Sequence, residues 1–183
     1  MAKVAAMQPV VRFLVRQWPF SAAVASALML ATAHAFEQFG GLEPCTLCLR
    51  QREVYWGALG IGLVGAVLQR APGKPWLVRI VCAALALTFL VSAAVAAYHA
   101  GVEWKWWPGP QACAAGGSAG DIGAGIDAML GGGKVAPPAC DKAAWVFLGL
   151  SMAGWNVLVS LVLAGFSAYA ACCRPWLAPK EAP

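Results

Sequence analysis

Charged residues are missing from four long stretches of the chain. No Asp, Glu, Lys or Arg occurs in residues 17–36, 54–69, 80–102 or 143–173. An α-helix rises about 1.5 Å per residue, so about 20 apolar residues cross the hydrocarbon core of a bilayer. The pattern predicts an all-α membrane protein, a bundle of four transmembrane helices within a single domain, residues 1–183. The expected spans are approximately 17–36, 49–69, 78–100 and 143–171.

The second span needs charged residues at its end. Its charge-free stretch is too short to cross a bilayer, so we expect its helix to begin earlier, near Cys48. Arg50, Arg52 and Glu53 would then lie at the membrane surface, where long side chains can extend their charged ends into water.

Composition narrows the class of protein further. Hydrophobic residues make up 61% of the chain and charged residues 11%, whereas an ordinary soluble domain has about 45–50% and about 25%. This excludes a typical soluble domain and a disordered chain. The net charge is only +5 and the basic residues are scattered, so we expect no nucleic-acid partner.

A cleaved signal peptide is the alternative for the first span. Basic residues precede it, and Ala33-His34-Ala35 resembles a cleavage site. Signal peptides carry an apolar core of about 7–15 residues, however, and this run is longer. We therefore expect it to remain as a membrane helix.

The basic residues predict the orientation of the bundle. One side of the four spans holds eight basic residues and one acid, Glu181: Lys3, Arg12, Arg16, Arg70, Lys74, Arg79, Arg174 and Lys180. The positive-inside rule places that side, with both termini, in the cytoplasm. The loops over 37–48 and 101–142 then face outward.

The second outer loop contains one candidate helix. Ile122, Ile126, Met129 and Leu130 follow a helical spacing after Asp121, a possible N-cap. We expect a short amphipathic helix on the membrane surface. The many glycines of the loop oppose this helix.

The seven cysteines divide according to this topology. Four of them, Cys45, Cys48, Cys113 and Cys140, would lie on the outer, oxidising side, where disulfides persist. Cys82 would lie within the third span and Cys172 and Cys173 at the cytoplasmic end of the fourth. We expect no redox role for these three.

The Cys45-Thr46-Leu47-Cys48 motif at the start of a span is the sharpest chemical feature. A helix N-terminus favours a thiolate, which is the reactive species in disulfide exchange. Arg52 lies one helical turn after Cys48 and would add a positive charge beside it. An inert structural disulfide is the open alternative.

Two other uses of the motif fit less well. Haem attachment requires a histidine after the second cysteine, where this chain has Leu49. Zinc sites commonly pair one CxxC with a second close pair, but Cys113 and Cys140 are far apart along the chain. We therefore expect no metal. Of the two histidines, His34 and His99, the second is the stronger site candidate because Tyr98, Glu103 and Trp107 lie near it in sequence.

These motifs together resemble the DsbB family of disulfide-forming membrane proteins. The resemblance covers nearly the whole chain. It rests on the segments Phe36 to Arg52, Tyr98 to Glu103 and Trp107 to Cys113, and on Cys140-Asp141 with Trp145, Phe147 to Met152, Trp155 and Asn156.

The resemblance implies a relay of two electrons. A reduced, periplasmic DsbA-like protein with a thioredoxin fold would attack a Cys113–Cys140 disulfide at Cys113, and Cys140 would exchange with Cys45. Cys48 would then be released as a thiolate beside a membrane quinone. The resemblance assigns quinone binding to Arg52, His99 and Cys48, with ubiquinone expected and menaquinone as the alternative. It places the protein in the bacterial inner membrane.

Two other functions remain to be distinguished. Vitamin K epoxide reductase-like proteins also combine four spans with a CxxC, but there the loop pair precedes the CxxC, whereas here it follows. A non-catalytic scaffold or channel would use the outer cysteines only as staples. No charged residue lies deep within a span to mark an ion path.

Overall fold

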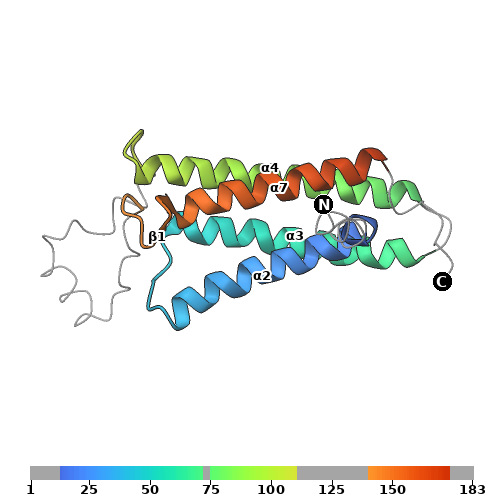
Figure 1. Cartoon of the computed structure of the whole chain (residues 1–183), viewed down its shortest axis with the longest axis horizontal. Helices are drawn as coiled ribbons and strands as arrows, with labels where there is room; N and C mark the ends of the chain where they lie inside the picture. The colour runs from blue at the N-terminus through green and yellow to red at the C-terminus, as the bar shows by residue number, and fades with distance from the viewer. Residues whose placement is uncertain (1–12, 72–74, 111–139, 174–183) are drawn as a thin grey trace, which may run out of the picture.

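The computed structural model describes residues 13–71, 75–110 and 140–173. Four long helices lie side by side in it (Figure 1): α2 (Trp18–Gln38), α3 (Thr46–Arg70), α4 (Pro75–Glu103) and α7 (Met152–Cys173). The predicted helical membrane bundle is therefore present. The amphipathic helix expected after Asp121 lies outside the described residues.

Three of these helices can cross a membrane by length and composition, namely α2, α4 and α7. The α3 helix has 25 residues and packs beside α2 and α4. Its first turns carry Arg50, Arg52 and Glu53, which lower its mean hydropathy. The second expected span is thus a helix of sufficient length, and its place in the bilayer remains a prediction.

The last helix begins later than its charge-free stretch predicts. Residues 146–151 form a hairpin of two short strands, β1 (Val146–Phe147) and β2 (Leu150–Ser151), in which Phe147 pairs with Leu150. Leu148 and Gly149 form its turn with φ of 51° and 79°, as a two-residue turn of this type requires. A stretch without charge indicates that its residues lie in an apolar environment, but it does not show where a helix begins. The turn at Leu148 and Gly149 interrupts the stretch, and α7 therefore begins only at Met152.

Small residues allow the helices to approach closely. Gly62 of α3 faces α2, and a Cβ at this position would lie 2.8 Å from the carbonyl oxygen of Pro19. At the same end of the bundle, the indole of Trp18 donates a hydrogen bond to Ser167 Oγ of α7 at 2.9 Å. Phe89 and Leu85 of α4 are fully buried at the centre. The bundle core is thus formed by all four helices.

The outer surface of the bundle is apolar. Large side chains such as Leu28, Leu63, Val67 and Leu87 are at least half exposed. So many exposed apolar side chains are typical of a surface covered by lipid.

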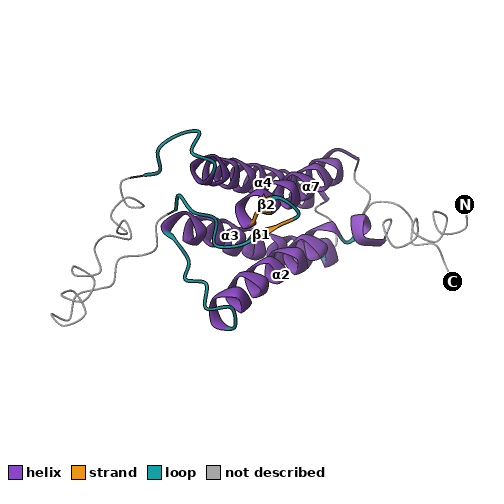
Figure 2. Ribbon diagram, turned by 60° about the vertical axis from the view of Figure 1, so that its left-hand side comes forward, coloured by secondary structure: helices purple, strands orange, loops and turns teal. Residues whose placement is uncertain are grey.

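One end of the bundle gathers the segments that the sequence predicts to face outward. The end of α2, the start of α3, the end of α4 and the hairpin all lie there (Figures 1 and 2). The residues predicted to carry chemistry are concentrated at this end.

Candidate functional site

Cys45 and Cys48 form a close pair at the start of α3. Cys45 is the N-cap of the helix, and its sulfur accepts a hydrogen bond from the backbone N–H of Cys48 at 3.3 Å. The two Sγ atoms lie 3.0 Å apart, and both cysteines are free. The pair is therefore in its reduced form. At this distance, one cysteine as a thiol can donate a hydrogen bond to the other cysteine as a thiolate.

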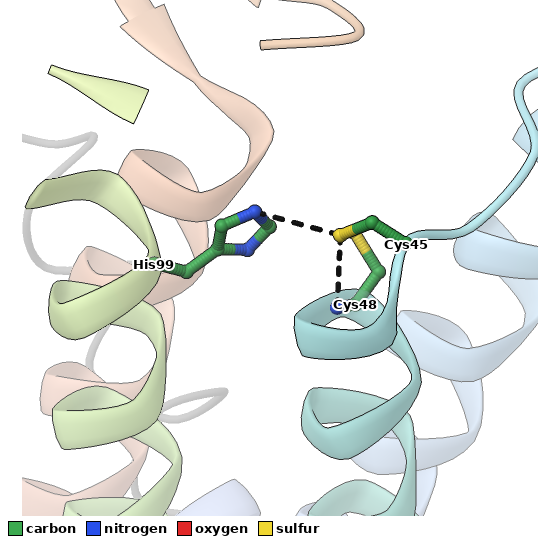
Figure 3. A group of neighbouring side chains, drawn as sticks. All are labelled: Cys45, Cys48 and His99. Carbon is green, nitrogen blue, oxygen red and sulfur yellow. Dashed lines mark hydrogen bonds between the residues drawn. The ribbon is translucent and has the colours of Figure 1, made fainter. Parts of the chain in front are cut away.

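His99 of α4 points at this pair (Figure 3). It is 3% exposed, and its Nε2 lies 3.6 Å from Cys45 Sγ. The same Nε2 lies 3.7 Å from Oε1 of Glu103, one turn further along α4. The ring is thus placed between a sulfur and a buried carboxylate.

These neighbours favour the thiolate form of Cys45. The hydrogen bond with Cys48 lowers the pKa of Cys45 to about 4, burial opposes this shift, and His99 contributes to it in the same direction as Cys48. At neutral pH the pair therefore holds a thiolate, the species that attacks a disulfide. Cys45 directly precedes the first residue of α3, so it lies beyond the N-terminal end of the helix.

A chain of buried polar groups continues from His99 into the bundle. Gln51 Nε2 lies 2.8 Å from His99 Nδ1, and Gln51 Oε1 accepts from Asn156 Nδ2 at 2.5 Å. Tyr55 donates to Asn156 Oδ1 at 2.7 Å and lies 3.0 Å from Ser160 Oγ. The chain joins α3, α4 and α7, and each member finds a partner in a low-dielectric interior where an unpaired polar group is costly.

Cys140 lies close to the CxxC pair. It is 1% exposed and packs in one small cluster with Cys45, Leu47 and Val102. It is disulfide-bonded, and its sulfur lies 3.4 Å from Thr46 Oγ1. The exposed Lys105–Asp141 ion pair, at 2.7 Å, joins the next residue to the end of α4. A disulfide sulfur and the CxxC pair thus share one buried cluster.

A cavity of about 180 Å³ opens beside the pair. Apolar residues of α2, including Met29 and Phe36, line it together with Cys45, Cys48 and Arg52. Arg52 is largely buried, pairs with the Glu37 carboxylate and donates to the Ala33 carbonyl at 3.1 Å. The α2 helix therefore holds the guanidinium in the wall of an apolar cavity.

The structure brings most of the predicted site residues together. Cys45, Cys48, Arg52 and His99 line the same cavity, and Cys140 packs against Cys45. Cys113 lies outside the described residues. His34 instead donates to the Leu30 carbonyl of its own helix at 2.8 Å.

The other three cysteines have different surroundings. Cys82 is fully buried in the bundle core, whereas Cys172 and Cys173 are exposed at the end of α7. All three are free.

Sequence reasoning missed several polar residues around the site. Gln51, Tyr55 and Asn156 were not predicted to contact His99 or one another, and Glu37 was not predicted as the partner of Arg52. The signal available was the presence of polar residues within apolar helices: Ser92, Asn156 and Ser160 interrupt stretches without charge. Such residues usually face the interior of a bundle.

The chain is similar to known proteins over most of its length. Residues 15–170 match the family model for the disulfide bond formation protein DsbB. A disulfide bond formation protein B of Methylococcus capsulatus is 32% identical over 148 residues, which cover 77% of this chain and 84% of the relative. One of Nitrosococcus oceani is 28% identical over 151 residues, covering 75% of this chain and 79% of the relative. The chain belongs to the DsbB family of disulfide bond formation proteins.

Proposed function

We propose that this protein is a quinone-reducing thiol oxidase that reoxidises a DsbA-like protein with a thioredoxin fold. One observation carries the proposal: the Cys45–Cys48 pair shares a buried cluster with the disulfide-bonded Cys140 and lines an apolar cavity that contains an arginine. A purely structural disulfide would not require a cavity beside the pair.

The first half of the relay is thiol–disulfide exchange. A thiolate of the reduced partner attacks the Cys113–Cys140 disulfide at Cys113, and Cys140 leaves as a thiolate. Cys140 attacks an oxidised Cys45–Cys48 pair at Cys45, and Cys48 leaves as a thiolate. Attack by the partner's second thiol on its mixed disulfide releases Cys113, which then attacks Cys140 and releases Cys45. Two electrons have moved from the partner to the pair, and the loop disulfide has reformed.

The structure resembles the state at the end of these steps. Cys140 is disulfide-bonded while Cys45 and Cys48 are free. His99 stabilises the Cys45 thiolate from one side, and Thr46 keeps its hydroxyl at the Cys140 sulfur. The packing of Cys45 against Cys140 shortens the movement that exchange requires.

The cavity fits a quinone ring in size and chemistry. A cavity of about 150 Å³ is enough for a benzene ring, and this one is about 180 Å³ with apolar walls. Arg52 can donate to a carbonyl oxygen, and Cys48 and His99 face the same space. A bound quinone, for which we propose ubiquinone, would supply the acceptor for the two electrons.

The proposed location is the bacterial inner membrane. Both termini would be cytoplasmic, and the CxxC end of the bundle would face the periplasm, where a DsbA-like partner is found. The proposal requires α3, the second span along the chain, to cross the membrane together with α2, α4 and α7. The exposed apolar side chains along α3, such as Leu63 and Val67, support its contact with lipid.

Quinone consumption by the purified protein tests this function. With a reduced DsbA-like protein and ubiquinone, wild type should consume quinone and Cys48→Ser should not, since no disulfide can then reform at Cys45. Cys172→Ser is the matched control, because Cys172 is exposed at the end of α7, and it should remain active. Full activity of Cys48→Ser would defeat the proposal.

A further inference from the structure

Three atoms suited to binding a soft metal ion meet at the start of α3. The sulfurs of Cys45 and Cys48 and a ring nitrogen of His99 all lie within 4.8 Å of one another (Figure 3). Zinc bonds of about 2.3 Å to sulfur and about 2.0 Å to nitrogen, in a tetrahedron, place these two ligand atoms about 3.5 Å apart. Cys45 Sγ and His99 Nε2 already lie 3.6 Å apart.

The two sulfurs need only a small adjustment. They lie 3.0 Å apart, whereas two thiolates on one zinc ion lie about 3.8 Å apart. Loss of the shared thiol proton removes the hydrogen bond that holds them together. Rotation of the Cys48 side chain can then open the pair.

Glu103 lies beside His99 but outside the group of three, so it would become a fourth ligand after a rotation of its side chain toward the two sulfurs. Its side chain is 6% exposed, and Oε1 lies 3.7 Å from His99 Nε2. Its other oxygen, Oε2, is buried without a hydrogen-bond partner within the described part of the chain. A buried carboxylate oxygen without a hydrogen-bond partner raises the free energy of the folded state. A cation held by the neighbouring sulfur and nitrogen atoms would be its partner.

We propose that the reduced form of this protein binds one zinc ion through Cys45, Cys48, His99 and Glu103, and that the oxidised form does not. Binding replaces the remaining thiol proton of the pair by the metal and changes no oxidation state. Two thiolates and one carboxylate exceed the charge of Zn²⁺ by one, and Arg52 and Lys142 line the same cavity. A Cys45–Cys48 disulfide removes both thiolates and with them the site.

The second ring nitrogen of His99 would gain the partner that a zinc ligand needs if the Gln51 amide turned over. When Nε2 binds a metal, Nδ1 carries the proton and requires an acceptor. Rotation of the Gln51 amide turns its oxygen toward Nδ1, which lies 2.8 Å from Gln51 Nε2. Asn156 can turn with it, because the hydroxyls of Tyr55 and Ser160 can donate or accept.

The site would make zinc an inhibitor selective for one redox state. A metal-bound thiolate pair cannot attack a disulfide or reform its own. The zinc-bound protein would therefore be held in its reduced form. This inference rests on the geometry of the dithiol and is independent of the quinone and the partner protein.

Zinc titration of the full-length protein in detergent tests the site. The protein should carry Cys172→Ser and Cys173→Ser, because these two free cysteines are exposed at the end of α7. After anaerobic reduction and removal of the reductant, Zn²⁺ is titrated against a chromophoric chelator. One equivalent should bind to the reduced protein, and binding to the protein oxidised at Cys45–Cys48 should be at least about 100-fold weaker, since metal binding requires thiolates.

Histidine variants identify the ligands. His99→Gln should weaken zinc binding at least about tenfold. Loss of a residue that only hydrogen-bonds to a metal ligand already lowers metal affinity by about tenfold or more. His34→Gln, at the other histidine of the chain, should bind zinc as wild type does. Equal binding by His99→Gln and wild type would overturn the site.

A second measurement uses the protein with all four proposed ligands intact, so it does not depend on variants of those ligands. X-ray absorption of the zinc-loaded protein should show two sulfur ligands and two nitrogen or oxygen ligands. Bound Zn²⁺ should also protect Cys45 from alkylation. A shell of sulfur alone, or no binding by the reduced protein, would exclude the proposal.

Discussion

Gln51 Nε2 lies 2.8 Å from Nδ1 of His99, and this contact determines which of the two ring nitrogens carries the proton of a neutral His99. Asn156 Nδ2 donates to Gln51 Oε1, so the Gln51 nitrogen is left to donate to Nδ1. Neutral His99 then carries its proton on Nε2, 3.6 Å from the Cys45 sulfur. A glutamine of α3 thereby prepares a histidine of α4 to donate to a thiolate.

Gln51→Leu should lower both stability and the reactivity of Cys45. It leaves His99 Nδ1 and Asn156 Nδ2 buried without their partner, which costs about 1–3 kcal/mol in the free energy of unfolding. Denaturation in detergent measures this loss. The rate of Cys45 alkylation at neutral pH should also fall, because His99 is no longer oriented as a donor.

Gln69→Leu is the matched control on the same helix. Gln69 donates to the Arg16 carbonyl at 2.7 Å, away from the cysteine pair. This variant should leave the pH profile of alkylation unchanged. If Gln51→Leu also left that profile unchanged while lowering stability, Gln51 would have a purely structural role.

The reduced pair should react with alkylating agents well into the acid range. The pKa of Cys45 is lowered from 9.0 to about 4, so the thiolate persists as the pH falls and is lost only near the lower value. In a variant without Cys172 and Cys173, the alkylation rate of Cys45 should stay nearly constant from alkaline pH down to about one unit above the lower value.

Cys48→Ala should shift this profile. The variant removes the thiol whose hydrogen bond is the largest cause of the lowered pKa. The midpoint of alkylation should move up toward the ordinary range of a cysteine, about 8.5. An unshifted midpoint would assign the effect to His99 alone.

Arg52→Gln should raise the KM for ubiquinone by about tenfold or more. A hydrogen bond to a charged group contributes about 1.5–3 kcal/mol, and this guanidinium lies in the cavity wall. Initial rates at varied ubiquinone and a fixed, saturating concentration of the reduced partner give KM and kcat separately.

Arg50→Gln is the control, two residues earlier. The Arg50 side chain is 71% exposed and pairs only on the surface with Glu53, at 2.8 Å. Such ion pairs contribute about 0–1 kcal/mol, and KM should not change. An equal rise in KM for both variants would point to general surface charge instead of a specific contact.

Tyr55→Phe should destabilise the bundle by about 1 kcal/mol. It removes the hydroxyl that donates to Asn156 Oδ1 at 2.7 Å, and hydrogen bonds between membrane helices contribute about 0.6 kcal/mol on average, at most about 1.7. Thermal denaturation in detergent should show a lower Tm. Tyr169→Phe, at a tyrosine 52% exposed on α7, should not change it.

The stretches without charge were sufficient to predict the helical bundle, and the CxxC before the second stretch was sufficient to predict a cysteine pair at a helix start. A stretch without charge must avoid water, and a CxxC before such a stretch lies at a helix N-terminus whatever the packing. Cys45 is indeed the N-cap of α3. The start of α7 could not be predicted in this way, because the turn at Leu148 and Gly149 depends on backbone dihedral angles.

By itself, the sequence determined what chemistry is available and at which end of the bundle it lies. The spacing of Cys45, Cys48 and Arg52 along one helix is local, and local spacing can be read from a chain. The tertiary structure decided which groups from other helices meet this segment. His99 and Gln51 come from different helices, as do Arg52 and Glu37. Such contacts depend on how the helices rotate and cross, and that is set by the packing of the whole bundle.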